Sequence, residues 1–288
     1  MIRKIIAPMY RKIIPQVIRK IIRKIIKKLY FIKHKIKNKF YPQKNPNKCF
    51  EILSQLKNKY KGERCFVLGN GPSLNKCDLS LLKDEYSFAV NGIFYKTDET
   101  GYKPNFYMVE DNHVVSDNLR RINSYKCEYK FFPENYRNLI SSDSTTVFIP
   151  MDAGFYREGH PYYCKPRFSK DVARGIFAGQ SVTIMQLQMA YHMGFSEVYL
   201  IGMDFSYSLL ESTEIEGCNY TSQEDDPNHF HPDYFGKGKK WHDPQLDRVL
   251  LNYQMCKEVF ESDGRHIYNA TIKGKLELFD RVDYNELF

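Results

Sequence analysis

Several features that mark common classes of protein are rare in this sequence or missing from it. The seven cysteines are isolated from one another, with no Cys-x-x-Cys pair and no Cys and His spacing typical of a zinc site. This pattern predicts reduced thiols in the cytoplasm rather than a disulfide framework. No apolar run approaches the ~18 residues that a transmembrane helix needs. Charges interrupt the isoleucines at the start of the chain, which argues against a signal peptide.

Acidic residues are missing from one part of the chain. Residues 1–48 hold 16 Lys and Arg and no Asp or Glu, whereas the other 240 residues carry 27 Lys and Arg against 34 Asp and Glu. The net charge of +9 therefore comes from a basic arm on a mildly acidic body. Proteins that bind nucleic acid normally have a basic core as well, so we expect no nucleic-acid partner. The length of 288 residues, of which 42% are apolar, predicts one or two folded domains rather than a disordered chain.

The basic arm repeats the phrase Arg-Lys-Ile-Ile four times within residues 1–40. Apolar pairs that recur every four residues predict an amphipathic helix with one isoleucine stripe and one cationic stripe. Pro8 and Pro15 interrupt this helix and leave 16–40 as its continuous part. We expect residues 1–41 to bind an anionic membrane surface, which makes the protein cytoplasmic and peripherally attached to the inner face of the membrane. A solvated basic tail and a nucleic-acid arm are the alternatives.

After a linker and lead-in helix at 42–62, residues 63–288 alternate apolar segments with polar loops and helical segments. The apolar segments predict strands at 64–68, 86–90, 105–109, 129–132, 145–149, 197–201 and 266–269. The helical segments are 49–60, 181–193 and 244–261, and Gly194 is the expected C-cap of the second. Continuously apolar strands are typical of a parallel sheet that helices bury on both faces. The expected fold class is therefore α/β, with a Rossmann-like and mostly parallel sheet.

Four of the predicted strands are followed by a polar side chain at the point where the strand ends. These side chains are Asn70, Asn91, Asp111 and Asp204. Ordinary turn chemistry explains any one of them. Because ligands of parallel sheets bind outside the carboxyl ends of the strands, the full set predicts a nucleotide-binding crevice.

The first of these strands runs into Gly69-Asn70-Gly71-Pro72-Ser73, a glycine loop. The loop lacks the third glycine of a dinucleotide fingerprint and the Gly-Lys-Ser/Thr of a P-loop. No Asp-x-Asp sequence occurs, so there are no obvious ligands for a metal–diphosphate clamp. A phosphate leaving group would then be stabilised by protein donors. Candidates for this role are Ser181, Tyr207, Tyr220, Lys237, Lys239 and Lys240.

Residues 206–243 form a long polar stretch without periodicity, which predicts an active-site lid. The stretch carries His229, His231 and His242, and a histidine beside a nucleotide can act as a general base because its unperturbed pKa is ~6.5. His242 is the preferred candidate, since it lies next to the helix expected from Pro244 and is therefore better anchored than the other two.

These motifs together carry a resemblance to a known group of enzymes. A strand followed by Gly-Asn-Gly-Pro-Ser-Leu, a strand ending in Asn91-Gly92, a strand ending in Gly-Met-Asp204-Phe and a later histidine loop occur in this order. The sequence thus resembles bacterial sialyltransferases of the Campylobacter lipooligosaccharide type over about residues 64–266. It is also similar to the broader group that includes motility-associated flagellin glycosyltransferases and 6-hydroxymethylpterin diphosphokinase-like proteins.

The resemblance implies a glycosyltransferase of the GT-A-variant type. Such an enzyme takes a sialic acid-like (nonulosonate) sugar from a CMP-activated donor and transfers it to a cell-surface glycan, as in lipopolysaccharide or capsule biosynthesis. It needs no metal or other cofactor. The alternatives are a pterin or nucleotide diphosphokinase of the same superfamily, with Mg²⁺ held by carboxylates such as Glu224-Asp225-Asp226, or a glycosyltransferase that uses a different nucleotide sugar. The exact donor, the acceptor, the linkage and the oligomeric state stay open.

The resemblance also implies roles for particular residues. His242, with Asp247 five residues later, matches the catalytic histidine of the family, and His229 matches an earlier histidine of the same loop. In the family a tyrosine follows Asp-Phe directly, whereas here Ser206 comes before Tyr207. The residues expected to bind the nucleotide or donor are Gly69, Asn70, Gly71, Ser73, Asn91, Asp111, Gln180, Ser181, Asp204 and Tyr207.

Overall fold

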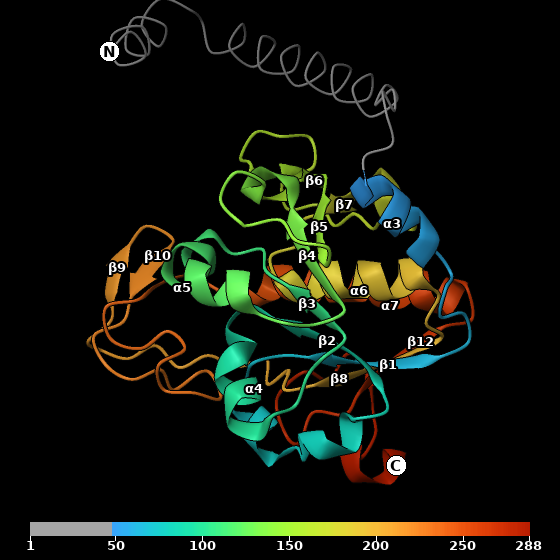
Figure 1. The fold of residues 1–288 in the computed structure, drawn as a ribbon. Coiled ribbons are helices and arrows are strands. Elements are labelled where there is room, and N and C mark those ends of the chain that lie inside the picture. The colour runs from blue at the N-terminus through green and yellow to red at the C-terminus, as the bar shows by residue number, and fades with distance from the viewer. Residues whose placement is uncertain (1–47) are drawn as a thin grey trace, which may run out of the picture.

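The computed structural model describes residues 48–288, so the predicted membrane helix of residues 1–41 and the start of the linker lie outside the described residues. One eight-stranded sheet forms the centre, in the order β13-β12-β8-β1-β2-β3-β4-β5 (Figure 1). All seven neighbouring pairs of strands are parallel. The strands are β1 Arg64–Leu68, β2 Tyr86–Val90, β3 Phe106–Met108, β4 Tyr129–Pro133, β5 Thr146–Ile149, β8 Glu197–Ile201, β12 His266–Asn269 and β13 Asp280–Arg281.

The structure confirms the predicted fold class and locates seven of these strands within a residue or two of the predicted positions. In β1, β2 and β8 only the first residue is partly exposed, and the other four are buried. Such burial on both faces explains why these strands are continuously apolar rather than alternating. Strand β13 is not predicted from the sequence, because two exposed residues are too short a segment to show a strand pattern.

Helices cover both faces of the sheet (Figure 1). Helices α6 (Val182–Met193) and α7 (Leu246–Ser262) lie on one face, and α4 (Phe94–Thr100) and the C-terminal turn at Tyr284–Leu287 lie on the other. Two further helices are α3 (Lys48–Leu56), which packs near β5, and α5 (Asn112–Ser124). Among residues 48–288, no helix is long and apolar enough to span a bilayer.

Helix α6 begins and ends as its sequence predicts. All of its residues are buried, Ser181 Oγ accepts a hydrogen bond from Thr183 N at the start, and Gly194 adopts φ 96° at the end. A left-handed C-cap of this kind favours glycine because a Cβ atom would be strained there. The helix therefore holds Ser181 and the preceding residue, Gln180, in place beside the sheet.

The strand order reverses at β1. The chain proceeds from β1 outward to β5 on one side, and β8, β12 and β13 lie on the other side. Beyond the strands, Gly69 N donates to Ile201 O at 2.8 Å, and a Cβ atom on Gly69 would lie 2.5 Å from Gly202 O. Only glycine allows the two strand ends to approach so closely. In sheets of this class, ligands bind at this reversal point.

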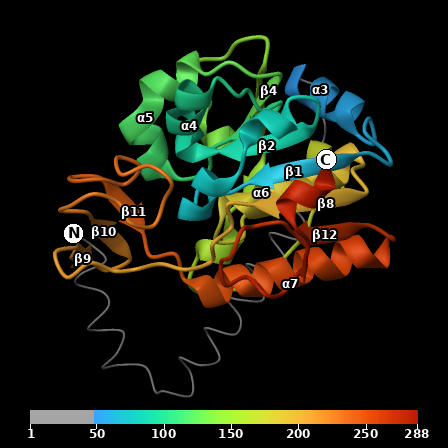
Figure 2. The same cartoon turned by 90° about the horizontal axis from the view of Figure 1, so that it is seen from below.

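Residues 206–243 contain a small antiparallel sheet, which differs from the irregular loop expected from the sequence. Its strands are β9 (Glu214–Glu216), β10 (Asn219–Thr221) and β11 (Lys240–His242), and it lies beside α5 (Figure 2). Strands of three residues are too short to show a periodic pattern in the sequence. A second small sheet pairs β6 (Met151–Asp152) with β7 (Ile176–Phe177). The lid function of residues 206–243 stays a prediction.

Candidate functional site

A cavity of about 590 Å³ opens at the carboxyl ends of β1, β2, β3 and β8. Its wall is built by the residues that follow these strands, by the start of α6 and by parts of residues 203–253. The structure therefore brings together side chains that are up to about 180 positions apart in the sequence, from Asn70 to Tyr253. The predicted site residues that line the cavity are Gly69, Asn70, Gly71, Asn91, Asp111, Gln180, Ser181, Asp204, Tyr207, His229 and His242.

Ser73 lies behind this wall rather than on it. Its side chain is buried, and its Oγ and N donate to Asp204 Oδ2 at 2.6 and 3.2 Å. A Cβ atom on Gly71 would lie 2.0 Å from the same carboxylate oxygen. Asp204 thus ties the glycine loop to the end of β8, and Ser73 supports the loop instead of facing a ligand.

Several residues that the sequence suggested for phosphate binding or catalysis do not line the cavity. They are Tyr220, His231, Lys237, Lys239 and Lys240. His231 stacks on Tyr95 with ring centroids 4.5 Å apart, and Lys239 Nζ lies 2.9 Å from Tyr95 Oη. Tyr220 packs edge-on against Trp241. The side chains of His231, Lys239 and Tyr220 thus contact neighbouring aromatic residues instead of facing the cavity.

The amide of Asn70 is held in one orientation by its neighbours. Its Nδ2 donates to Val90 O at 3.0 Å and to Tyr234 Oη at 2.8 Å, and only 7% of the residue is exposed. Because a carbonyl oxygen can only accept, the nitrogen must face Val90, and Oδ1 is left as the free group. Within residues 48–288, neither this oxygen nor Asn91 Oδ1 has a hydrogen-bond partner. Two unpartnered acceptors in the cavity wall suit a ligand that carries donors.

Tyr234 connects the glycine loop to His229. Its ring stacks on the imidazole with centroids 4.0 Å apart and planes 3° from parallel. A Cβ atom on Gly92 would lie 2.7 Å from the Tyr234 ring, so the Asn-Gly turn after β2 makes room for it. Phe230 N also donates to Asn70 O at 2.9 Å. The 206–243 segment is therefore docked directly on the predicted nucleotide-binding loop.

Glu110, the second residue after β3, also lines the cavity, although it is not among the site residues predicted from the sequence. Burial raises the pKa of its carboxyl to about 7, and the adjacent Asp111 contributes to the rise. Asp111 itself caps α5, since its Oδ1 accepts from His113 N at 2.7 Å and from Val114 N at 3.2 Å. Only the second member of this Glu-Asp pair is among the residues predicted from the sequence. The wall thus contains a carboxyl group that is about half protonated near neutral pH.

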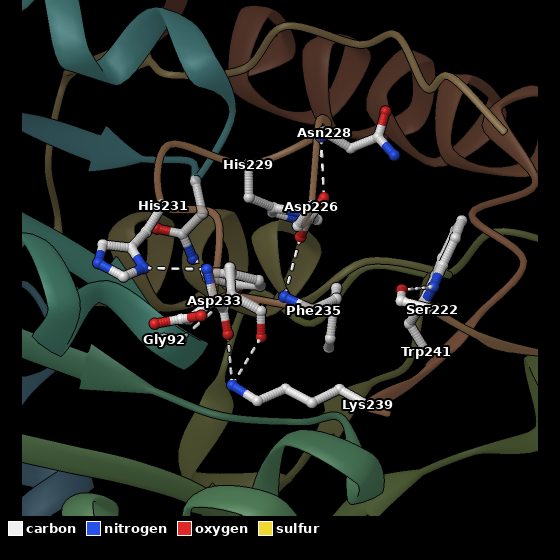
Figure 3. A network of polar contacts seen from close by, with 12 residues as sticks. Gly92, Ser222, Asp226, Asn228, His229, His231, Asp233, Phe235, Lys239 and Trp241 are labelled. Carbon is white, nitrogen blue, oxygen red and sulfur yellow. Dashed lines mark hydrogen bonds and ion pairs between the residues drawn. The ribbon is translucent and has the colours of Figure 1, made fainter. Parts of the chain in front are cut away.

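A buried carboxylate holds the ring of His229 (Figure 3). His229 Nδ1 lies 2.7 Å from Asp226 Oδ2, and the carboxylate also accepts from Phe235 N at 2.9 Å and from Asn228 N at 2.8 Å. Burial alone would raise the pKa of Asp226, but the hydrogen bonds and the neighbouring imidazole hold it below its usual value. Asp226 therefore stays ionised, and Nε2 is the ring nitrogen of His229 that stays available.

His242 reaches the cavity from β11. Its Nε2 lies 3.0 Å from Asn112 Oδ1, and its ring centroid is 4.4 Å from that of His113. Burial lowers the pKa of His242, which Asp111 partly offsets and His113 reinforces. The imidazole is therefore neutral at pH 7. Unlike His229, its ring is held by an amide rather than by a carboxylate.

The side chains of the acidic run Glu224, Asp225 and Asp226, which the sequence suggested for a metal site, do not face the same way. Asp226 turns inward to His229, whereas Glu224 and Asp225 are exposed and Glu224 Oε1 accepts from Ser212 Oγ. Among residues 48–288, no group of three or more His, Cys, Asp or Glu side chains is arranged to hold a metal ion. The run therefore does not present three carboxylates to the cavity.

Residues 38–209 match the family described as 6-hydroxymethylpterin diphosphokinase MptE-like. The chain belongs to this family. The match includes the polar strand ends from Asn70 to Asp204, whereas Asp226, His229 and His242 lie beyond it. This places the chain in the broader group that the sequence motifs indicated, without specifying a sialyltransferase.

Other comparisons are more distant. No curated protein matches the chain. Among solved structures, the MAf glycosyltransferase from Magnetospirillum magneticum AMB-1 is similar, with 13% sequence identity and a TM-score of 0.45. The match covers 83% of this chain and 38% of that one, so this chain spans little more than a third of that protein's length.

Proposed function

We propose that this protein is a glycosyltransferase that moves a nonulosonate sugar from a CMP-activated donor to a cell-surface glycan. One observation carries the proposal: the His229–Asp226 pair opens onto the same cavity as the unpartnered oxygens of Asn70 and Asn91. A proton acceptor and a nucleoside-binding wall are the two parts that such a transfer requires.

The two asparagine oxygens favour the nucleoside part of the donor over its phosphate. The oxygens of an ionised phosphate can only accept hydrogen bonds. A phosphate therefore cannot donate to Asn70 Oδ1 or Asn91 Oδ1. The ribose hydroxyls and the exocyclic amino group of cytosine are donors of the required kind. A cytidine nucleotide can therefore satisfy both oxygens.

His229 is the general base in this proposal. Asp226 accepts the Nδ1 hydrogen, which leaves Nε2 to take the proton of the acceptor hydroxyl. The hydroxyl oxygen forms a bond to the anomeric carbon, while the bond between that carbon and the phosphate oxygen breaks and its electron pair leaves with CMP. The ionised Asp226 stabilises the imidazolium that forms. The sequence favoured His242, which stays the alternative base because it lines the same cavity.

Family membership supports a second candidate, a pterin or nucleotide diphosphokinase. In that case Glu110 and Asp111 would face a nucleoside triphosphate and its Mg²⁺ ion. Calorimetry with CMP, CDP, UDP, GDP and ATP, each with Mg²⁺ and with EDTA, distinguishes the two functions. The glycosyltransferase proposal requires that CMP bind most tightly and that EDTA leave its affinity unchanged. Tightest binding of ATP, lost in EDTA, would favour the diphosphokinase instead.

We further propose that residues 1–41 attach the enzyme to the inner face of the membrane. The 14 Lys and Arg of residues 1–40 alternate with isoleucine pairs, and each cation near an anionic surface contributes ~1 kcal/mol. This attachment would keep the catalytic domain close to a membrane-borne glycan acceptor.

A further inference from the structure

The charged side chains of the cavity are unevenly divided. Among residues 48–288, Arg248 is the only Lys or Arg that lines the cavity, and it lies in the first turn of α7. Four carboxyl groups share the wall with it. They belong to Glu110, Asp111, Asp204 and Asp243. An anionic ligand therefore has one guanidinium group to pair with.

Neutral partners fix the direction of the Arg248 side chain. Its Nη2 donates to Tyr163 Oη at 2.7 Å and its Nη1 to Gln180 Oε1 at 3.4 Å, and the guanidinium lies 5.0 Å from the centre of the Tyr163 ring. No carboxylate among residues 48–288 forms an ion pair with it, whereas Arg64, Arg137 and most other arginines of this region have one. These contacts orient the charge without neutralising it. A positioned and unpaired guanidinium is suited to bind a phosphate.

Three of the four carboxyl groups of the wall already accept hydrogen bonds within the chain, among them Asp243 Oδ1, which accepts from Gln245 N at 3.2 Å. Asp204 is engaged by Ser73, and Asp111 caps α5. Glu110 is about half protonated near pH 7. The acceptor oxygens of Asn70 and Asn91 lie on the loops after β1 and β2 rather than on α7, and they require hydrogen-bond donors from a ligand. The wall thus has an acceptor region at the strand ends and a cationic region at α7.

We propose that Arg248 binds the phosphate of the nucleotide, so that the nucleoside is directed to Asn70 and Asn91. This inference rests on the proposed function, since it assumes that a nucleotide occupies the cavity. It adds the orientation of the ligand and names a residue that lies outside the region matched by the family.

The test compares cytidine with CMP, which differ only in the phosphate. Calorimetry measures the affinity of each for the full chain, for Arg248→Gln and for Arg174→Gln, a control that removes the same charge from a side chain that is 83% exposed. We expect Arg248→Gln to weaken CMP binding by about 10- to 100-fold, the effect of losing hydrogen bonds to a charged group. Cytidine affinity should change less than about twofold, and the control should bind both ligands like the wild type. Arg248→Lys, which keeps the charge, should recover part of the CMP affinity.

Equal weakening of cytidine and CMP, or no weakening of either, would overturn the assignment of Arg248. A melting temperature within about 2 °C of that of the wild type shows that a variant is folded. If Arg248→Gln does not fold, the affinities of Arg248→Lys for cytidine and CMP test the proposal instead. If the wild type binds neither cytidine nor CMP, the CMP donor of the proposed function is wrong. The same comparison with uridine and UMP, guanosine and GMP, and adenosine and AMP then tests Arg248 separately, and binding of none of them refutes both proposals.

Discussion

Glu110 gives a prediction that links the cavity to the pH dependence of stability. Burial raises the pKa of its carboxyl from the ordinary value of 4.5 to about 7 in the folded protein. Between these two pH values the folded state holds a proton that the unfolded state has lost. The contribution of Glu110 to the free energy of unfolding therefore falls as the pH rises from 4.5 to 7, and it becomes constant on either side of that window.

The size of the effect follows from the same two values. At roughly 1.4 kcal/mol per pH unit, the difference between 4.5 and about 7 corresponds to about 3 kcal/mol. Glu110→Gln has nearly the same shape and cannot ionise, so it lacks this contribution. Relative to the wild type, the variant should therefore gain about 3 kcal/mol of stability between pH 4.5 and pH 8.

Urea unfolding of both proteins at four pH values across this range measures the difference. Groups that titrate equally in the two proteins cancel, and Glu216→Gln, which removes a carboxyl from an exposed position on β9, provides the control. A difference between Glu110→Gln and the wild type that stays constant with pH would refute the reasoning. The ionised carboxylate also opposes an anionic ligand, so CMP affinity of the wild type should decline above pH 7 more than that of the variant.

Three further predictions concern the base, the nucleoside wall and the arm. His229→Ala should lower kcat by about 10²–10⁴ with donor affinity nearly unchanged, and steady-state kinetics should show a smaller loss for His242→Ala; the reverse order would make His242 the base. Asn70→Ala leaves a ligand donor unpaired at a cost of about 1–3 kcal/mol, so calorimetry should show roughly tenfold weaker CMP binding, and unchanged affinity would remove Asn70 from the site. Deletion of 1–41 should release the protein from anionic vesicles in sedimentation assays while turnover on a soluble acceptor persists, and continued sedimentation would refute the membrane attachment.

The sheet could be predicted from the sequence because each of its longer strands is a short segment that consists almost entirely of apolar residues. Five-residue apolar segments such as 64–68 and 197–201 carry their own signal, and Gly194 marks the end of α6. Helix α5 gives little signal in the sequence because few of its residues are apolar, and its N-cap, Asp111, has the residue type expected of a ligand-binding side chain. A capping carboxylate and a ribose-binding carboxylate are both expected after a strand, so the sequence cannot separate them.

A site residue could be predicted from the sequence where its role depends on its position at the end of a strand. It could not be predicted where its role depends on a contact with a residue that is distant in the sequence. Asn70 and Asn91 could be placed at a crevice from the sequence, but the free oxygen of Asn70 follows from contacts with Val90 and Tyr234. The role proposed for Arg248 similarly depends on contacts with Tyr163 and Gln180, which lie 85 and 68 positions away.

The residues proposed to bind and to react with the ligand lie partly inside and partly outside the region that matches the family model. The matched region ends at residue 209 and includes the reversal point of the sheet, where any nucleotide ligand of this fold binds. The His229–Asp226 pair and Arg248 come after it. In the proposed function the fold provides the crevice, and His229 and Arg248 provide the base and the cation, so we expect residues 210–288 to determine the reaction type. Substitutions there should change turnover and phosphate recognition while nucleoside binding persists, and this separation is what the Arg248 and His229 variants measure.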